Sequence, residues 1–157
     1  MSRIAVLDFE TTGLSPDEGD RATEVAIVLT ENGAVVDRYQ SLMYAGVRIP
    51  SFITDLTGIT DAMVRKAPPA SVVMAEAAHF VGDAPIVAHN ASFDQRFWIS
   101  ELRRARVPCA HPFACTLLAS RRLYPEAPNH RLGTLVDFHG LPRTGTAHRA
   151  LADAEMA

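Results

Sequence analysis

Five residues of this sequence could together bind a metal ion and move a proton: Asp8, Glu10, Asp94, His148 and Asp153. Asp8 and Glu10 follow an apolar run, and the two-residue period of a strand would place both carboxylates on one face. Two like charges at the end of a buried strand repel each other and lose hydration. A divalent cation that prefers oxygen ligands, such as Mg²⁺, would relieve that cost.

Each of these residues also has a simpler explanation, which the pattern leaves open. Asp8 and Glu10 could be solvated where a strand enters a loop, and the helix dipole alone favours Asp94 in a first helical turn. His148 could be a surface or capping histidine. On one continuous helix, His148 and Asp153 would lie about 140° apart, so we expect them to approach one site from different directions.

Length and composition indicate one domain, residues 1–157, that is large enough for a real core. No apolar run is long enough to span a membrane and no signal peptide follows Met1, which predicts a soluble, cytoplasmic protein without membrane contact. The two cysteines, Cys109 and Cys115, lack metal-site spacing and suit reduced thiols. The formal charge of −3 excludes a generally basic surface for tight binding to duplexes.

Contacts with nucleic acid would therefore be local, and three groups of arginines are candidates. These are Arg103 and Arg104 with Arg106, the pair Arg121 and Arg122, and Arg131. Each group could contact phosphates or form an ordinary solvated helix face, and the sequence does not decide between them.

Hydrophobic periodicity and turn residues predict an α/β chain that opens with three strands. A tight turn at Asn32-Gly33 joins the second strand to the third, and a long loop at 11–23 could cover a site. The last predicted strands are short, and Ser92 is expected to cap the helix that carries Asp94. The predicted strands are 4–9, 24–29, 35–42, 86–88 and a brief piece near 113–114, and the predicted helices are 69–81, 92–102, 116–124, 131–138 and 144–155.

Taken together, three motifs in order resemble one family, the DEDDh exonucleases, and more narrowly the DnaQ-like relatives of the proofreading subunit of bacterial DNA polymerase III. The motifs are LDFETTGL at 7–14, VAHNASFD at 87–94 and HRALADA at 148–154. The phrase LTGIT at 56–60 matches the linker that is usual in this family. The resemblance covers nearly the whole chain.

The resemblance implies a ribonuclease H-like fold, with a mixed five-stranded sheet, an opening antiparallel trio and helices on both faces. It also implies two divalent metal ions, Mg²⁺ or Mn²⁺. In such enzymes Asp8, Glu10 and Asp153 would hold one ion, Asp8 would bridge to the second, and Asp94 would hold the second directly or through water. His148 would be the general base. The implied reaction releases nucleoside 5′-monophosphates from the 3′ end of single-stranded DNA by two-metal hydrolysis.

The same resemblance implies a pocket for the terminal nucleotide, lined by Phe9, Thr11, Thr12, Gly13, Leu14 and Asn90. An RNA-directed exonuclease of this family is the alternative, because sensing of the 2′-hydroxyl depends on pocket shape. A binding module without catalysis is disfavoured, since all four acids and the histidine are present.

Two features depart from the family pattern. Cys115 stands where many relatives carry an aspartate, which is not one of the metal ligands. The sequence also stops four residues after Asp153, which suggests a fragment, and it lacks the extension that docks a polymerase in relatives. A polymerase partner is therefore not supported by the sequence alone.

Overall fold

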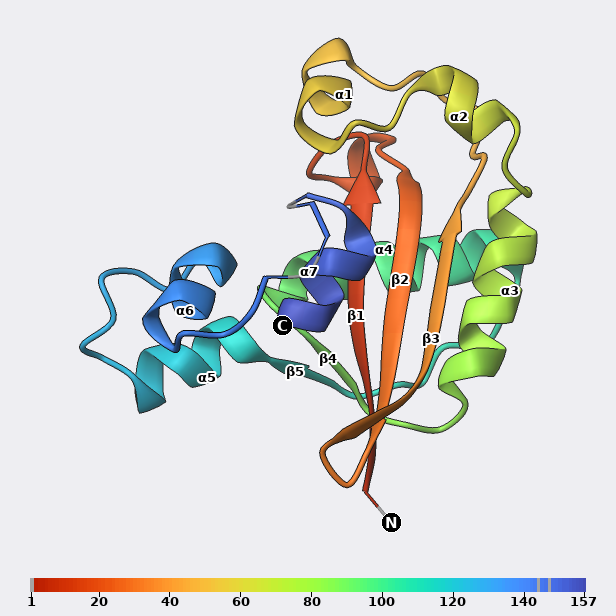
Figure 1. Ribbon diagram of the computed structural model, residues 1–157. Helices are drawn as coiled ribbons and strands as arrows, with labels where there is room; N and C mark the ends of the chain where they lie inside the picture. The colour runs from red at the N-terminus through yellow and green to blue at the C-terminus, as the bar shows by residue number, and fades with distance from the viewer. Residues whose placement is uncertain (1, 144, 147) are drawn as a thin grey trace.

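A five-stranded mixed sheet forms the centre of the protein, which we describe from a computed structural model that covers residues 2–143, 145–146 and 148–157 (Figure 1). The strand order is β3-β2-β1-β4-β5. β1 (Arg3–Thr11), β2 (Ala22–Glu31) and β3 (Ala34–Leu42) pair antiparallel. β4 (Ile86–Ala88) and β5 (Phe113–Cys115) continue the sheet in parallel with β1. The expected mixed sheet with an opening antiparallel trio is confirmed.

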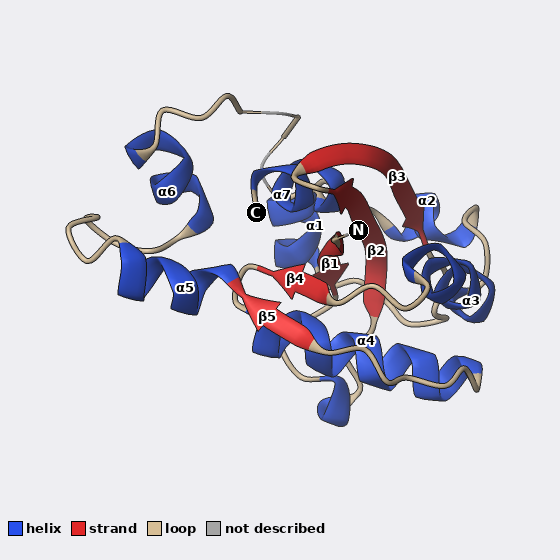
Figure 2. Cartoon of the chain, turned by 90° about the horizontal axis from the view of Figure 1, so that it is seen from below, coloured by secondary structure: helices blue, strands red, loops and turns tan. Residues whose placement is uncertain are grey.

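Helices cover both faces of this sheet, as Figure 2 shows for α4 and α7. One face of β1, which carries Ala5 and Leu7, packs against α3 (Ala70–Val81) and α4 (Ala91–Ala105) and forms the main core. The opposite face packs against α7 (Ala150–Met156). This arrangement follows from the alternation of buried side chains along β1.

Small side chains bring α7 close to the strands. Ala150 and Ala154 of α7 are buried against Ala26 and Val28 of β2. Ala26 is the β2 partner of Asp8 in the sheet register. The helix that carries Asp153 therefore lies directly over the part of the sheet that carries Asp8.

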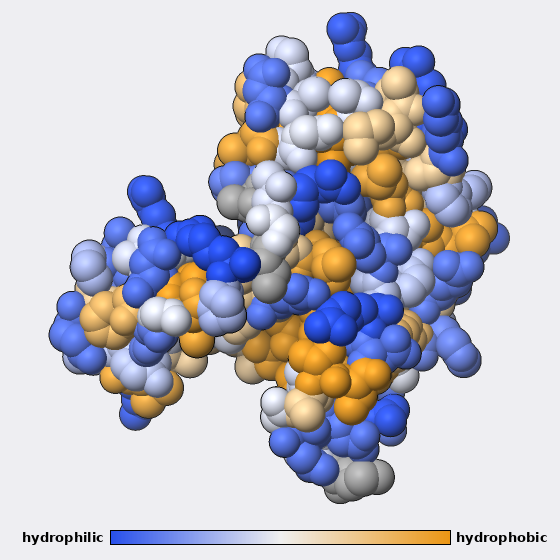
Figure 3. All heavy atoms as spheres, in the orientation of Figure 1, coloured by the Kyte–Doolittle hydropathy of each residue, from blue (hydrophilic) through white to orange (hydrophobic). Residues whose placement is uncertain are grey.

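The remaining helices lie at the edges of the sheet. α1 (Ser51–Thr57) and α2 (Asp61–Arg65) lie beyond the carboxyl end of β1, after the 3-10 turn η1 (Pro16–Glu18) and the first three strands. α5 (Thr116–Leu123) and α6 (Leu132–Phe138) form a lobe that stands out from the body, on the left in Figure 3. Among the described residues, we find no helix with the length and apolarity needed to cross a membrane.

Two expected helix starts are wrong. The helix expected to be capped by Ser92 begins at Ala91, with Asn90 as the N-cap residue in the left-handed region at φ 61°. The helix expected over 144–155 begins only at Ala150, and two positions of that range, 144 and 147, lie outside the described residues. A side chain from β2 accepts the hydrogen bond of the Ala150 N–H, and the sequence pattern of the helix itself does not contain this contact.

Candidate active site

Three carboxylates meet where β1 passes beneath α7. β1 contributes Asp8 and Glu10, and α7 contributes Asp153. One oxygen from each carboxylate can be chosen so that all three lie within 4.8 Å of one another. Asp8 and Glu10, which were predicted to share one face of a strand, are therefore joined by an acid more than 140 residues later in the chain.

Asp94 borders this cluster from the first turn of α4. Its side chain is 2% exposed, and its Oδ1 accepts a hydrogen bond of 3.0 Å from the backbone N–H of Phe9. Among the charged neighbours of Asp8, Asp94 raises the pKa of Asp8 most. The fourth predicted acid therefore lies beside the other three, and its position is fixed by β1.

Burial and mutual repulsion make these acids hard to ionise. Burial, followed by the charges of its acidic neighbours, raises the pKa of Asp8 well above its usual value. The same causes raise the pKa of Glu10 to about 9, and burial raises the pKa of Asp94 to about 8. The Oδ2 atom of Asp8 is buried without a hydrogen-bond partner among the described residues. A cation would satisfy this oxygen and offset the repulsion, so the four acids fit divalent metal ions.

His148 lies two residues before the start of α7, next to the acid cluster. Its backbone has φ of 60°, in the left-handed region, so it does not belong to the helix and the expected 140° separation from Asp153 does not apply. Burial raises the pKa of Asp153, and His148 partly offsets this effect. His148 and Asp153 line two pockets, so they lie where these two pockets meet.

The first pocket, of about 730 Å³, opens over the acids at the end of β1. The loop 11–14 forms one wall, and α1 forms another with Phe52, Ile53 and Leu56. Leu14 and Phe52 are 77% and 67% exposed, so apolar side chains flank the opening. The sequence motifs did not single out the α1 wall, although the LTGIT phrase begins within it. Phe9 also lines the pocket, but its ring is buried against Trp98 and offers little surface to a ligand.

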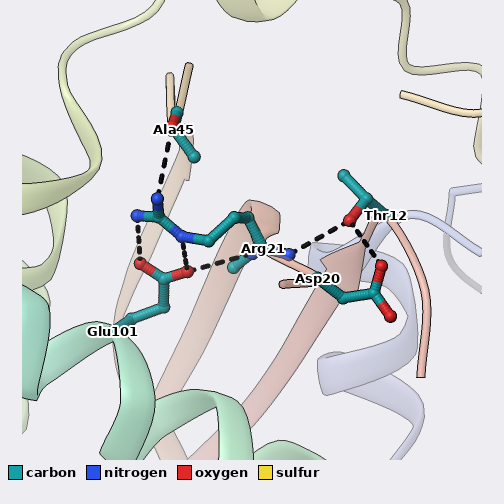
Figure 4. Close-up of polar contacts among 6 residues, drawn as sticks. Thr12, Asp20, Arg21, Ala45 and Glu101 are labelled. Carbon is teal, nitrogen blue, oxygen red and sulfur yellow. Dashed lines mark hydrogen bonds and ion pairs between the residues drawn. The ribbon is translucent and has the colours of Figure 1, made fainter. Parts of the chain in front are cut away.

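A hydrogen-bond network fixes the 11–14 loop, as Figure 4 shows. The backbones of Thr12 and Arg21 are joined at 2.9 Å, and the Thr12 hydroxyl donates to Asp20 Oδ1 at 3.2 Å. The Arg21 guanidinium donates twice to Glu101 of α4, at 2.8 and 2.9 Å. A Cβ atom on Gly13 would overlap the Asp20 carboxylate, so this loop accepts only glycine at position 13 without rearrangement.

The second pocket, of about 920 Å³, runs from His148 and Asp153 to the lobe of α5 and α6. Its lining includes Asn90, Arg121 and Arg131. Two of the three candidate arginine groups therefore reach a pocket that adjoins the acids. Arg103 and Arg104 lie instead in the last turn of α4 and line neither pocket.

Comparison with known proteins shows the family and the fold of the chain. A family model described as an exonuclease, RNase_T, matches residues 5–157. The chain belongs to this exonuclease family. Exonuclease X, whose structure was solved in complex with 5′ overhanging duplex DNA, is 30% identical to this chain, with a TM-score of 0.78. The match covers 99% of this chain and 86% of the other. The nuclease domain of 3′hExo, a DEDDh family member, is 19% identical with a TM-score of 0.83, over 99% of this chain and 87% of the other, which confirms the expected fold.

Curated relatives of this exonuclease domain are much longer. A DNA polymerase III PolC-type from Halalkalibacterium halodurans is 39% identical over 98% of this chain and 11% of its own length. The 3′-5′ exonuclease DinG of Bacillus subtilis is 36% identical over 98% of this chain and 16% of its own length. The chain thus spans about a tenth to a sixth of the length of these relatives.

Two residues beside the acid cluster were missed by the sequence analysis. Glu24 of β2 is paired with Glu10 in the sheet register and is 1% exposed. Arg149 follows His148 and binds Glu24 with Nη2 and Oε2 2.8 Å apart. A single acid at the start of an apolar strand gave no signal that it would be buried.

Proposed function

We propose that this domain is a divalent-metal-dependent 3′-5′ exonuclease that releases nucleoside 5′-monophosphates from single-stranded DNA. The observation that carries the proposal is the cluster of Asp8, Glu10 and Asp153, whose oxygens lie within 4.8 Å of one another, with His148 at the junction of two pockets. Membership of the exonuclease family supports the reaction class.

In this proposal the acids divide between two metal ions. Asp8, Glu10 and Asp153 would hold one ion, and Asp8 and Asp94 would hold the second. When bound, Mg²⁺ or Mn²⁺ would polarise the phosphodiester and the attacking water and stabilise charge on the leaving oxygen. His148 accepts a proton from the water as its oxygen bonds to phosphorus. The bond from phosphorus to the 3′ oxygen breaks, and that oxygen takes a proton from solvent.

The two pockets suggest a path for the strand. The terminal nucleotide would occupy the pocket over β1, between the 11–14 loop and α1, where Leu14 and Phe52 offer apolar surface to a base. The preceding nucleotides would follow the second pocket past Asn90, where Arg121 and Arg131 could meet their phosphates.

DNA is favoured over RNA as the substrate by the relatives. Those at 36% to 39% identity are DNA polymerase III PolC-types and a DinG exonuclease. If the domain has a DNA polymerase as its partner, it would act together with a polymerase, as the name of the PolC-type relatives suggests for their matching region. An RNA-directed exonuclease is the second candidate and is separated by the same experiment.

The test uses matched DNA and RNA oligonucleotides labelled at the 5′ end. With Mg²⁺ or Mn²⁺, we expect a ladder of progressively shorter labelled DNA, and no cleavage in chelator. Internal cleavage or immediate release of the labelled 5′ nucleotide would refute the polarity. Faster shortening of RNA would favour the second candidate, and inactivity on both would refute the proposal.

A further inference from the structure

Glu24 is a buried acid beside the site that the proposed reaction does not use. Its carboxylate accepts hydrogen bonds from Arg149 Nε at 3.2 Å, Arg149 Nη2 at 2.8 Å, the Ala150 backbone N–H at 2.9 Å and Gln40 Nε2 at 3.2 Å. Asp8 differs, because one of its oxygens has no partner among the described residues. The oxygens of Glu24 are occupied by donors, so Glu24 is not available as a further metal ligand.

These contacts hold the start of α7. Arg149 is the N-cap residue, has an extended backbone at φ −121°, and its side chain does not cap the helix. Glu24 takes over that role by accepting from the Ala150 N–H. α7 has seven residues, and a helix of this length is not stable without tertiary contacts.

We call the contacts of Glu24 with Arg149 and the Ala150 N–H the clamp. The clamp adjoins His148 and Asp153, the two residues of the site that come from the end of the chain. His148 immediately precedes Arg149 and has φ of 60°, a conformation that a residue with a side chain keeps only when its surroundings impose it. Asp153 lies one helical turn beyond Ala150, and its backbone N–H donates to Arg149 O at 3.1 Å. Loss of the clamp would therefore release both groups without removing either.

We propose that Glu24 and Arg149 are positioning residues of the exonuclease, which fix His148 and Asp153 over the carboxylates of β1. The inference rests on the proposed function for its catalytic meaning. Direct contact of Arg149 with the substrate is the competing explanation.

The chain contains a matched control for a lost ion pair on α7. Arg38 of β3 binds Glu155, which lies two residues after Asp153. The Arg38 Nε and Glu155 Oε1 atoms are 2.8 Å apart. The side chains of this pair are 52% and 20% exposed, whereas those of Arg149 and Glu24 are 32% and 1% exposed. An exposed pair of this kind contributes little to stability. Arg38→Ala thus removes a contact between α7 and the sheet and leaves the clamp in place.

The experiment compares single-turnover rates, KM for a DNA oligonucleotide and Mn²⁺ affinity among variants. Arg149→Ala and Glu24→Gln should each lower the rate roughly 10–100-fold, the usual effect of losing a group that orients another, with KM near wild type. The double variant should lose no more than the worse single variant, because the two residues act as a unit. Arg149→Lys should recover part of the rate, and Arg38→Ala should match wild type.

Several outcomes would overturn the proposal. A raised KM with an unchanged rate would make Arg149 a substrate contact, and Mn²⁺ affinity that falls in Glu24→Gln but not in Arg149→Ala would make Glu24 a ligand. An equal loss of rate in Arg38→Ala would mean that any contact between α7 and the sheet has this effect, and that the clamp has no specific positioning role. If Glu24→Gln melts before it can be assayed, Arg149→Ala carries the test because that side chain is partly exposed.

Hydrogen exchange provides a readout that needs no substrate. Backbone amides of α7 should exchange faster in Arg149→Ala than in Arg38→Ala, while amides of β1 and β2 remain protected. Unchanged exchange in α7 would refute the clamp. Absence of nuclease activity in wild type would instead refute the proposed function, and the exchange result would still decide whether Glu24 and Arg149 hold α7.

Discussion

Asp8 is the residue on which the metal site depends most directly. Four other acids raise its pKa, and its Oδ2 lies buried without a partner among the described residues. Asp8→Ala should abolish turnover, yet without metal it should leave the fold intact or slightly more stable, because it removes one of several repelling carboxylates. Melting curves with and without Mn²⁺ check this. An equal gain from Mn²⁺ in both proteins would exclude Asp8 as a ligand.

His148 should behave differently because its predicted role is to accept a proton. His148→Ala should lower the single-turnover rate by roughly 10²–10⁴-fold, the range for a positioned acid–base group, with Mn²⁺ affinity near wild type. Calorimetric titration of Mn²⁺ beside the rates is the measurement. His79→Ala, at an exposed histidine on α3, is the matched control. A rate that is not reduced in His148→Ala would return His148 to a surface histidine.

At the scale of elements, the ion pair of Arg21 and Glu101 joins the loop before β2 to α4. Glu101 is 1% exposed and also accepts from the Ala22 N–H at 3.2 Å. Glu101→Ala should cost roughly 3–5 kcal/mol of unfolding free energy, because it leaves the Arg21 guanidinium, whose side chain is only 13% exposed, without its partner. KM for the oligonucleotide should rise as well, since the same network holds the 11–14 loop.

Chemical denaturation and steady-state kinetics measure these two effects of Glu101→Ala. Arg3→Ala is the control, because it removes an exposed contact of Arg3 with Glu31 and should cost no more than about 1 kcal/mol. If Glu101→Ala is no less stable than Arg3→Ala, the pair does not anchor the loop.

At the scale of the whole molecule, the acid cluster links stability to pH. The pKa values of Glu10 and Asp94, about 9 and about 8, exceed the values near 4 that such groups have in unfolded chains. The folded state therefore binds more protons, and its stability falls as pH rises. This contribution is fully present below about pH 4 and is lost as pH rises through about 8 to 9.

The melting temperature in chelator should therefore fall from mildly acidic to alkaline pH, and the gain from Mn²⁺ should grow over the same range because metal displaces protons. His89 acts in the opposite direction, since burial lowers its pKa. Comparison with Glu10→Gln isolates the cluster, because this variant should show a shallower slope. An identical slope in both proteins would contradict the assignment.

The second pocket gives a further prediction for the whole molecule, concerning salt. Arg121 and Arg131 are exposed at its lining, and each phosphate contact with a single strand contributes about 0.7 to the slope of log affinity against log salt. Replacing both with alanine should weaken oligonucleotide binding and reduce that slope by roughly 1.4. Titrations at several salt concentrations test this. The double replacement of Arg103 and Arg104 is the control, and an equal loss of slope there would argue against a defined path.

The sequence by itself determined which candidate functional residues occur and in what order along the chain. Alternation in β1 placed Asp8 and Glu10 on one face, and three motifs in order predicted the family, the fold and a grouping of Asp94 and Asp153 with them. These features depend on local periodicity and on residue spacing, which a single sequence displays. The family and the fold are confirmed, and the roles of the individual residues remain predictions.

Tertiary structure decided the features that depend on contacts between distant segments. Small side chains set the approach of α7 to the sheet, and Glu24 of β2 fixes where that helix begins, so His148 precedes the helix rather than belonging to it. The α1 wall and the placement of Arg121 and Arg131 beside the acids depend in the same way on packing. A helix pattern in a sequence records propensity, whereas a buried carboxylate 126 residues away can supply the cap.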